Sequence, residues 1–151
     1  KKNNRLTSPY NRLNMLQLAL EPHKPCFTLS RFELKTKEAS YTYRTIAHFH
    51  KIYGRSRLYF IMGSDSLKEL KSWRNFRNIL TAVEIIAGGR PPIKTLEGRP
   101  RHTGGEALLK TKLPHVSSSD IRRRVFAGKS ITGLVPEPVK KYIFEHGLFR
   151  N

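Results

Sequence analysis

The stretch Leu58 to Trp73 reads L-Y-F-I-M-G-S-D-S-L-K-E-L-K-S-W, and the fold of the whole chain can be inferred outward from it. Its first five residues, Leu58 to Met62, form a short apolar run that ends at a glycine. Such a run is typical of a strand buried on both faces, as in parallel sheets. Gly63 then allows a tight turn or a close approach to a ligand, and Ser64 is expected to cap a helix that opens at Asp65.

Asp65 is therefore predicted just past the carboxyl end of a buried strand, where open α/β sheets bind ligands. Its carboxylate has two interpretations that the sequence leaves open. It can stabilise the first turn of its helix, or it can accept hydrogen bonds from a ribose or a base. Trp73, the only tryptophan, also has two interpretations. It is a core residue by default, or it is a flat stacking platform at the mouth of a pocket, which its polar neighbours favour.

Composition narrows the class of protein without choosing a ligand. With 151 residues, the chain is interpreted as one domain, 1–151, large enough to bury a core. Its formal net charge of +18 favours anionic partners, either nucleic acid or nucleotide phosphates. The lone Cys26 fits a reducing, cytoplasmic setting. No apolar run is long enough to span a membrane, and His48 and His50 are too badly spaced on a helix to predict a metal site.

A second run, Val83 to Ala87, is apolar except for Glu84 and predicts another buried strand that also ends at a glycine, Gly88. We expect both runs in one parallel sheet, with Gly63 and Gly88 at the same edge. Ile93 to Lys112 is expected to form a long loop, followed by a short strand near Leu113 to Val116. Strands that alternate with helices predict an α/β fold with a doubly wound parallel sheet.

Two further helix starts carry hydroxyl groups. Ser40-Tyr41-Thr42 is expected to open one helix, with Ser40 or Thr42 as its cap. Ser117-Ser118-Ser119-Asp120-Ile121-Arg122 is expected to open another. Three serines exceed what one cap needs, and Arg122 follows one turn later. Free backbone N–H groups, hydroxyls and a guanidinium together favour a phosphate site, although ordinary capping explains part of the pattern.

Taken together, the motifs resemble those of bacterial nicotinate-nucleotide adenylyltransferases, which are nucleotidyltransferases with a Rossmann-like fold. The resemblance covers nearly the whole chain in order and spacing. It rests on R-L-N-M-L-Q-L-A-L (Arg12 to Leu20), F-E-L (Phe32 to Leu34), A-S-Y-T (Ala39 to Thr42), F-I-M-G-S-D-S-L (Phe60 to Leu67) with Trp73, S-S-S-D-I-R (Ser117 to Arg122) and L-V-P-E-P-V…Y-I…H-G-L-F (Leu134 to Phe149).

The resemblance implies an enzyme of NAD biosynthesis that transfers an adenylyl group from ATP, with Mg²⁺, to nicotinate mononucleotide. It also implies a role for particular residues. The acceptor nucleotide would contact Thr42, Trp73 and Lys1, the last as the basic residue after the family's Pro-Pro-His stretch. ATP would contact Gly63, Asp65, Ser117, Ser119 and Arg122. Arg122 would stabilise the transferring phosphate and so serve as the catalytic residue.

The sequence departs from the family at its start. The family's G-x-F-D-P-x-H-x-G-H segment, with two catalytic histidines, is absent, because none of the six histidines lies in an H-x-G-H. They are His23, His48, His50, His102, His115 and His146. We therefore expect the sequence to represent the C-terminal three-quarters of the family's domain, without its first β-α-β unit, and to be inactive alone.

Two rival functions remain at this stage. A sister nucleotidyltransferase would use another acceptor, nicotinamide mononucleotide or pantetheine phosphate. A non-catalytic basic module would bind nucleic acid, and its affinity would fall steeply with salt. Because the resemblance includes core and pocket positions alike, we expect small-molecule substrates rather than nucleic acid, no membrane association, and a chain that is compatible with a homo-oligomer.

Overall fold

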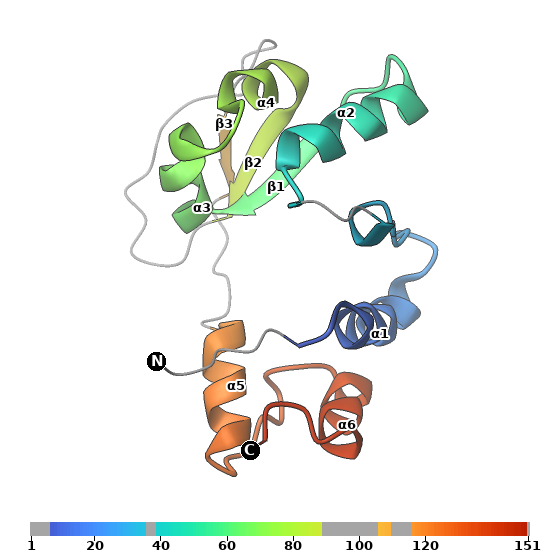
Figure 1. Cartoon of the computed structure of the whole chain (residues 1–151), viewed down its shortest axis with the longest axis vertical. Coiled ribbons are helices and arrows are strands. Elements are labelled where there is room, and N and C mark those ends of the chain that lie inside the picture. The colour runs from blue at the N-terminus through green and yellow to red at the C-terminus, as the bar shows by residue number, and fades with distance from the viewer. Residues whose placement is uncertain (1–6, 36–38, 89–105, 110–115, 151) are drawn as a thin grey trace. The chain divides into compact units, whose positions relative to one another are not determined.

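The computed structural model describes residues 7–35, 39–88, 106–109 and 116–150. It divides into two compact units: Lys35–His115, here called the sheet unit, and Lys1–Leu34 with Val116–Asn151, here called the helical unit (Figure 1). The interpretation of residues 1–151 as one domain stays a prediction, and each unit is described by itself.

The sheet unit contains three parallel strands in the order β1 (Tyr59–Gly63), β2 (Glu84–Gly88) and β3 (Glu106–Leu109). Both predicted strands are present, each displaced by one residue toward the C-terminus. The expectation that the first is buried on both faces is wrong. Strand side chains alternate between two faces: Phe60 and Met62 of β1 pack in the core, whereas Tyr59 and Ile61 are 51% and 71% exposed. The register pairs Gly63 with Gly88, so the two glycines lie at the same edge, as expected. The α/β class with a parallel sheet is confirmed.

Strand β3 lies within Ile93 to Lys112, which was expected to form a loop; that part of the prediction is wrong. Residues 106–109 pair with residues 85–88 of β2, so the strand is stabilised by a partner about twenty residues away in sequence. A run of four residues is too short to show a strand period by itself. Of the strand expected near Leu113 to Val116, residues 113–115 lie outside the described residues, and Val116 belongs to no strand.

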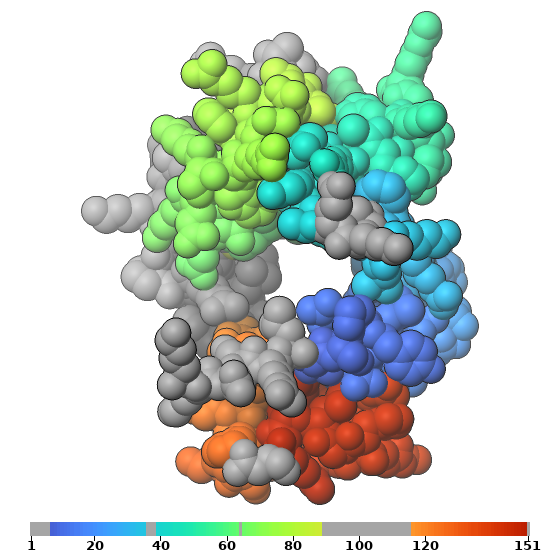
Figure 2. All heavy atoms as spheres, viewed as in Figure 1, coloured from blue at the N-terminus to red at the C-terminus, as the bar shows by residue number. Residues whose placement is uncertain are grey.

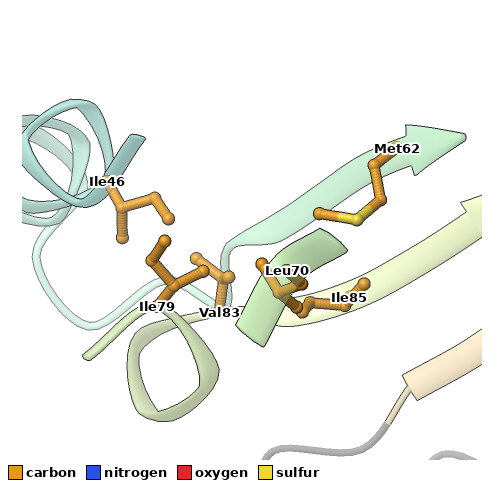
Figure 3. Packing of buried hydrophobic residues seen from close by; sticks show 6 residues of the cluster. All are labelled: Ile46, Met62, Leu70, Ile79, Val83 and Ile85. Atoms are coloured by element: carbon orange, nitrogen blue, oxygen red, sulfur yellow. The ribbon is translucent and has the colours of Figure 1, made fainter. Parts of the chain in front are cut away.

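The helices of the sheet unit are α2 (Thr42–Tyr53), α3 (Ser64–Glu69), the 3₁₀ turn η3 (Leu70–Ser72) and α4 (Phe76–Ala82). Their apolar side chains meet those of β1 and β2 in one core, seen in Figure 3, formed by Ile46, Met62, Leu70, Ile79, Val83 and Ile85. In the space-filling view, the green to yellow-green atoms of α3 and α4 cover much of the sheet on this side (Figure 2).

The helical unit contains α1 (Pro9–Leu20), α5 (Ser118–Phe126) and α6 (Glu137–Glu145), with the 3₁₀ turn η1 (Glu21–His23) after α1 and another, η2 (Glu33–Lys35), at its boundary. Its core consists of Val125, Ile131, Val139 and Ile143. The Tyr142 hydroxyl joins α6 to α1, donating to Asn11 Oδ1 at 2.9 Å and accepting from Asn14 Nδ2 at 3.0 Å. Among the described residues, every helix is too short or too polar to cross a membrane.

Candidate functional site

A pocket of about 270 Å³ lies in the sheet unit between the start of α2 and the turn that precedes α4. Its walls come from two segments that are some thirty residues apart in sequence. The residues that line the pocket are Ser40, Tyr41, Thr42, Trp73, Arg74 and Ile79. The pocket therefore brings together Thr42 and Trp73, the two described residues expected to contact the acceptor.

Trp73 is placed by a tight turn between two helices. Its N–H donates to the Leu70 carbonyl at 3.0 Å, and its own carbonyl accepts from the Phe76 N–H at 3.1 Å. Asn75 completes the turn in the left-handed region, with φ of 55°, and is the N-cap of α4. Asparagine tolerates this conformation better than most residues do.

The Trp73 side chain combines the two roles that the sequence left open. It is half-buried and packs against the core of the sheet unit, meeting the Phe60 ring edge to face with centroids 6.2 Å apart. It also lines the pocket. The indole is thus fixed from behind by apolar contacts, which makes it a rigid wall rather than a mobile surface residue.

Helix α2 begins at Thr42, with Tyr41 as its N-cap and no side-chain capping hydrogen bond. The expectation that Ser40 or Thr42 caps this helix is therefore wrong. Neither hydroxyl makes a hydrogen bond to another described residue. Because both residues line the pocket, their hydroxyls are available to hydrogen-bond a bound molecule.

Arg74 is a pocket residue that the sequence reasoning missed. Its guanidinium lies over the Tyr41 ring, 4.9 Å from the centroid, and its Nη1 donates to the Tyr41 hydroxyl at 3.3 Å. The only signal in the sequence is its position next to Trp73. Nothing in the sequence links it to Tyr41, which lies 33 positions earlier.

Gly63 and Asp65 lie together where β1 passes into α3. Gly63 is the N-cap and α3 begins at Ser64, so the expected cap by Ser64 is wrong. Gly63 has an ordinary φ of −76°, and a Cβ there would meet nothing within 4 Å. The turn itself therefore does not require glycine. The Asp65 carboxylate is exposed in the first turn and has no hydrogen bond or ion pair with any described residue.

The serine-rich start of α5 lies in the helical unit. Ser117 is the N-cap, and its Oγ accepts from the Asp120 N–H at 3.0 Å, which confirms the capping interpretation for this serine. Ser119 has a different partner: its Oγ accepts from Arg122 Nη2 at 3.0 Å. The start of α5 therefore holds Arg122 beside the first turn.

The three consecutive arginines of α5 differ in their partners. Arg124 donates through Nε to Asp120 Oδ2 at 3.0 Å, and Arg123 pairs with Asp120 Oδ1. These two hydrogen bonds, that from Arg124 first, lower the pKa of the Asp120 carboxyl below its usual value. Arg122 forms no ion pair with any residue the structure describes. Of the three, Arg122 is therefore the arginine whose charge has no carboxylate partner among the described residues.

The predicted site residues thus form three groups. Thr42 and Trp73 share the pocket, Gly63 and Asp65 share the end of β1, and Ser117, Ser119 and Arg122 share the start of α5. The first two groups belong to the sheet unit and the third to the helical unit. Lys1 lies outside the described residues.

A parallel α/β sheet with a helix that starts directly after a strand, and with a pocket beside its helices, is typical of nucleotide-binding proteins. The family model for cytidylyltransferase-like proteins matches residues 1–124. The chain therefore belongs to the cytidylyltransferase-like family.

Curated relatives define the group more narrowly. The chain is 35% identical to a probable nicotinate-nucleotide adenylyltransferase of Desulfitobacterium hafniense, over 97% of this chain and 73% of the relative. It is 31% identical to the nicotinate-nucleotide adenylyltransferase of Bacillus subtilis, over 100% of this chain and 77% of that protein. The resemblance to nicotinate-nucleotide adenylyltransferases that the motifs predicted is confirmed.

The fold has a close match among solved structures. A Plasmodium falciparum nicotinic acid mononucleotide adenylyltransferase complexed with NaAD superposes with a TM-score of 0.78, over 99% of this chain and 78% of that one. The sequence identity is 20%, so this likeness supports the fold alone.

Proposed function

We propose that this protein transfers the adenylyl group of ATP to nicotinate mononucleotide, giving deamido-NAD and pyrophosphate, as a step of NAD biosynthesis. One observation carries the proposal. In a chain of this family, the fold builds one pocket from the S-Y-T segment and Trp73, the segments that the resemblance assigns to the acceptor. The curated relatives carry the name of this activity.

The pocket supplies what a pyridine mononucleotide needs. The Trp73 indole offers a flat wall for the pyridine ring, and stacking on aromatic side chains binds bases in general. The Thr42 and Ser40 hydroxyls, which have no partner among the described residues, are available for the polar groups of the nucleotide. Lys1, outside the described residues, stays a predicted contact of the acceptor.

ATP is the second substrate. Gly63 and Asp65 are proposed to face its nucleoside, with the Asp65 carboxylate near the ribose hydroxyls and the missing side chain of Gly63 permitting close approach. Ser117, Ser119 and Arg122 are proposed to hold its phosphates. The hydrogen bond from Arg122 to Ser119 fixes the guanidinium beside the helix start, where backbone N–H groups already favour anions.

The reaction needs no nucleophile from the protein. A phosphate oxygen of the mononucleotide attacks the α-phosphorus of ATP, the new P–O bond forms, and the bond to the β-phosphate oxygen breaks to release pyrophosphate. The protein contributes by holding the two substrates in line and by placing positive charge where negative charge grows. Arg122 is proposed to supply that charge from α5.

We propose that Mg²⁺ enters with ATP rather than from a site built by the protein. Mg²⁺ keeps several waters and prefers substrate phosphates to all-protein cages. Among the residues that the structure describes, no three His, Cys, Asp or Glu side chains are grouped so as to hold a metal ion. When bound to ATP, Mg²⁺ neutralises phosphate charge; every role given above belongs to the chain's own residues.

A cytoplasmic setting and a possible homo-oligomer remain parts of the proposal. Both follow from the expected metabolic role and from the sequence. Size-exclusion chromatography with light scattering on the full-length protein would measure the oligomeric state directly.

The test is turnover by the full-length protein. We expect deamido-NAD and pyrophosphate to appear in equal amounts when ATP and nicotinate mononucleotide are supplied together, and neither product when one substrate is omitted. Nicotinamide mononucleotide and pantetheine phosphate are tested in parallel as rival acceptors. Absence of turnover with all three, together with DNA binding that falls steeply between low and high salt, would instead favour the basic nucleic-acid module suggested by the charge of +18.

A further inference from the structure

The charge of the pocket points to one form of the acceptor. Among the described residues that line the pocket, Arg74 is the only charged side chain, and none is acidic. No residue that the structure describes forms an ion pair with Arg74. The described walls of the pocket therefore carry a positive charge that no described side chain neutralises.

Arg74 is held in place by a series of aromatic contacts that leads back to the core. Its guanidinium rests over the Tyr41 ring and its Nη1 donates to the Tyr41 hydroxyl. The Tyr41 ring stacks on the Tyr43 ring, with centroids 6.0 Å apart and planes at 28°. Tyr43 packs against the core of the sheet unit. An exposed arginine braced in this way loses less rotamer freedom when it binds an anion.

The chemistry of the guanidinium separates an acid from an amide. It has five N–H donors in a planar fork, and the Tyr41 hydroxyl uses one of them. A carboxylate can accept two of the others in parallel, as a charge-assisted pair. A carboxamide carries no charge, and its own NH₂ donors would face the donors of the fork. A flat indole and a guanidinium held by Tyr41, both from residues of one pocket, therefore fit a flat ring that bears a carboxylate.

We propose that Arg74, positioned by Tyr41, is the specificity-determining residue that makes the acceptor pocket select the acid form of the pyridine mononucleotide over the amide form. This inference rests on the proposed function, because it concerns the choice between two acceptors of the same reaction. It adds a residue and a physical cause that neither the motifs nor the names of the relatives supply.

The experiment compares kcat/KM for nicotinate and nicotinamide mononucleotide, at saturating ATP, in the full-length protein. Arg74→Gln is expected to lower kcat/KM for the acid at least tenfold, which corresponds to about 1.4 kcal/mol, and to change the value for the amide less than twofold. Arg74→Lys keeps the charge without the fork and should fall between wild type and Arg74→Gln. Arg77→Gln is the matched control, since Arg77 is exposed on α4 over the Phe76 ring and does not line the pocket.

The outcomes separate this inference from the proposed function. An unchanged acid-to-amide ratio in active Arg74→Gln protein overturns the inference and leaves the proposed function intact. An equal loss for both acceptors overturns it as well, because the guanidinium would then serve the shared phosphate or the shape of the pocket. If Arg74→Gln protein does not fold by circular dichroism, the ratio for Arg74→Lys decides the matter. No turnover of either acceptor by wild type refutes the proposed function and this inference with it.

Discussion

Replacing Arg122 by alanine gives the sharpest test of the phosphate site. The guanidinium donates one hydrogen bond to Ser119 at 3.0 Å, which leaves four of its five N–H groups for a ligand. No described carboxylate neutralises it. A charge-assisted hydrogen bond of this kind contributes about 1.5–3 kcal/mol. We therefore expect Arg122→Ala to lower kcat/KM for ATP by about 10- to 150-fold, since about 1.4 kcal/mol corresponds to tenfold.

The neighbouring arginine supplies the control. Arg123 has the same chemistry one residue later on the same helix, but it is engaged by Asp120 and its side chain is 79% exposed. Arg123→Ala should change kcat/KM for ATP less than about threefold, a shift of well under 1 kcal/mol. The assay is steady-state pyrophosphate release at saturating acceptor with ATP varied. Equal kcat/KM for wild type and Arg122→Ala, or equal losses in the two variants, would contradict the assigned role.

Three other substitutions, with Ile52→Ala as a control, test the pocket, the core and the stability of the fold in acid. Trp73→Ala should raise the acceptor KM by a factor equivalent to about 1–3 kcal/mol of lost stacking and leave the ATP KM nearly unchanged. In the wild-type protein, nicotinate mononucleotide should change tryptophan fluorescence more than ATP does. Unchanged emission would count against stacking. Ile79 is 1% exposed, and Ile79→Ala should lower the free energy of unfolding by about 2–5 kcal/mol. Ile52 is 56% exposed, and Ile52→Ala should change that free energy by less than about 0.5 kcal/mol. Similar urea midpoints for the two variants would refute the assigned core. The pKa of Asp120 is lowered in the folded state, so the ionised carboxylate stabilises the fold above the unfolded pKa of 3.8, and this stabilisation is lost as pH falls through the folded pKa. The difference in free energy of unfolding between wild type and Asp120→Asn should therefore vanish in acid and be constant near neutrality.

The strands and their register follow directly from local sequence. Leu58 to Met62 is apolar without interruption, Val83 to Ala87 is apolar except for Glu84, and short runs of this kind that end at glycine favour strands. Burial of both faces did not follow for the first run, because Tyr59 and Ile61 are exposed. The glycines that end them were expected at the same edge, and they pair in the sheet. By contrast, β3 is a strand because β2 offers it backbone partners, and residues 106–109 alone do not show that.

The side-chain contacts at the start of α5 follow from the spacing of its residues in the sequence. Asp120 lies three and four residues before Arg123 and Arg124, the separations at which helical side chains meet. The same count leaves Arg122 without an acidic partner in its helix and places it three residues after Ser119, to which it donates. The choice among the three arginines could therefore have been made from sequence alone.

The sequence by itself determined the α/β class and the parallel pairing of the two predicted strands, and it predicted the segments of the proposed site. All of these depend on periodicity, on glycines at strand ends and on residue types within one or two turns of each other. Only the tertiary structure decided that Trp73 is both a core contact and a pocket wall, and that Tyr41 positions Arg74. Those contacts join α2 to the turn before α4 through packing on a shared core, and no local pattern records which distant side chains that packing brings within reach of each other.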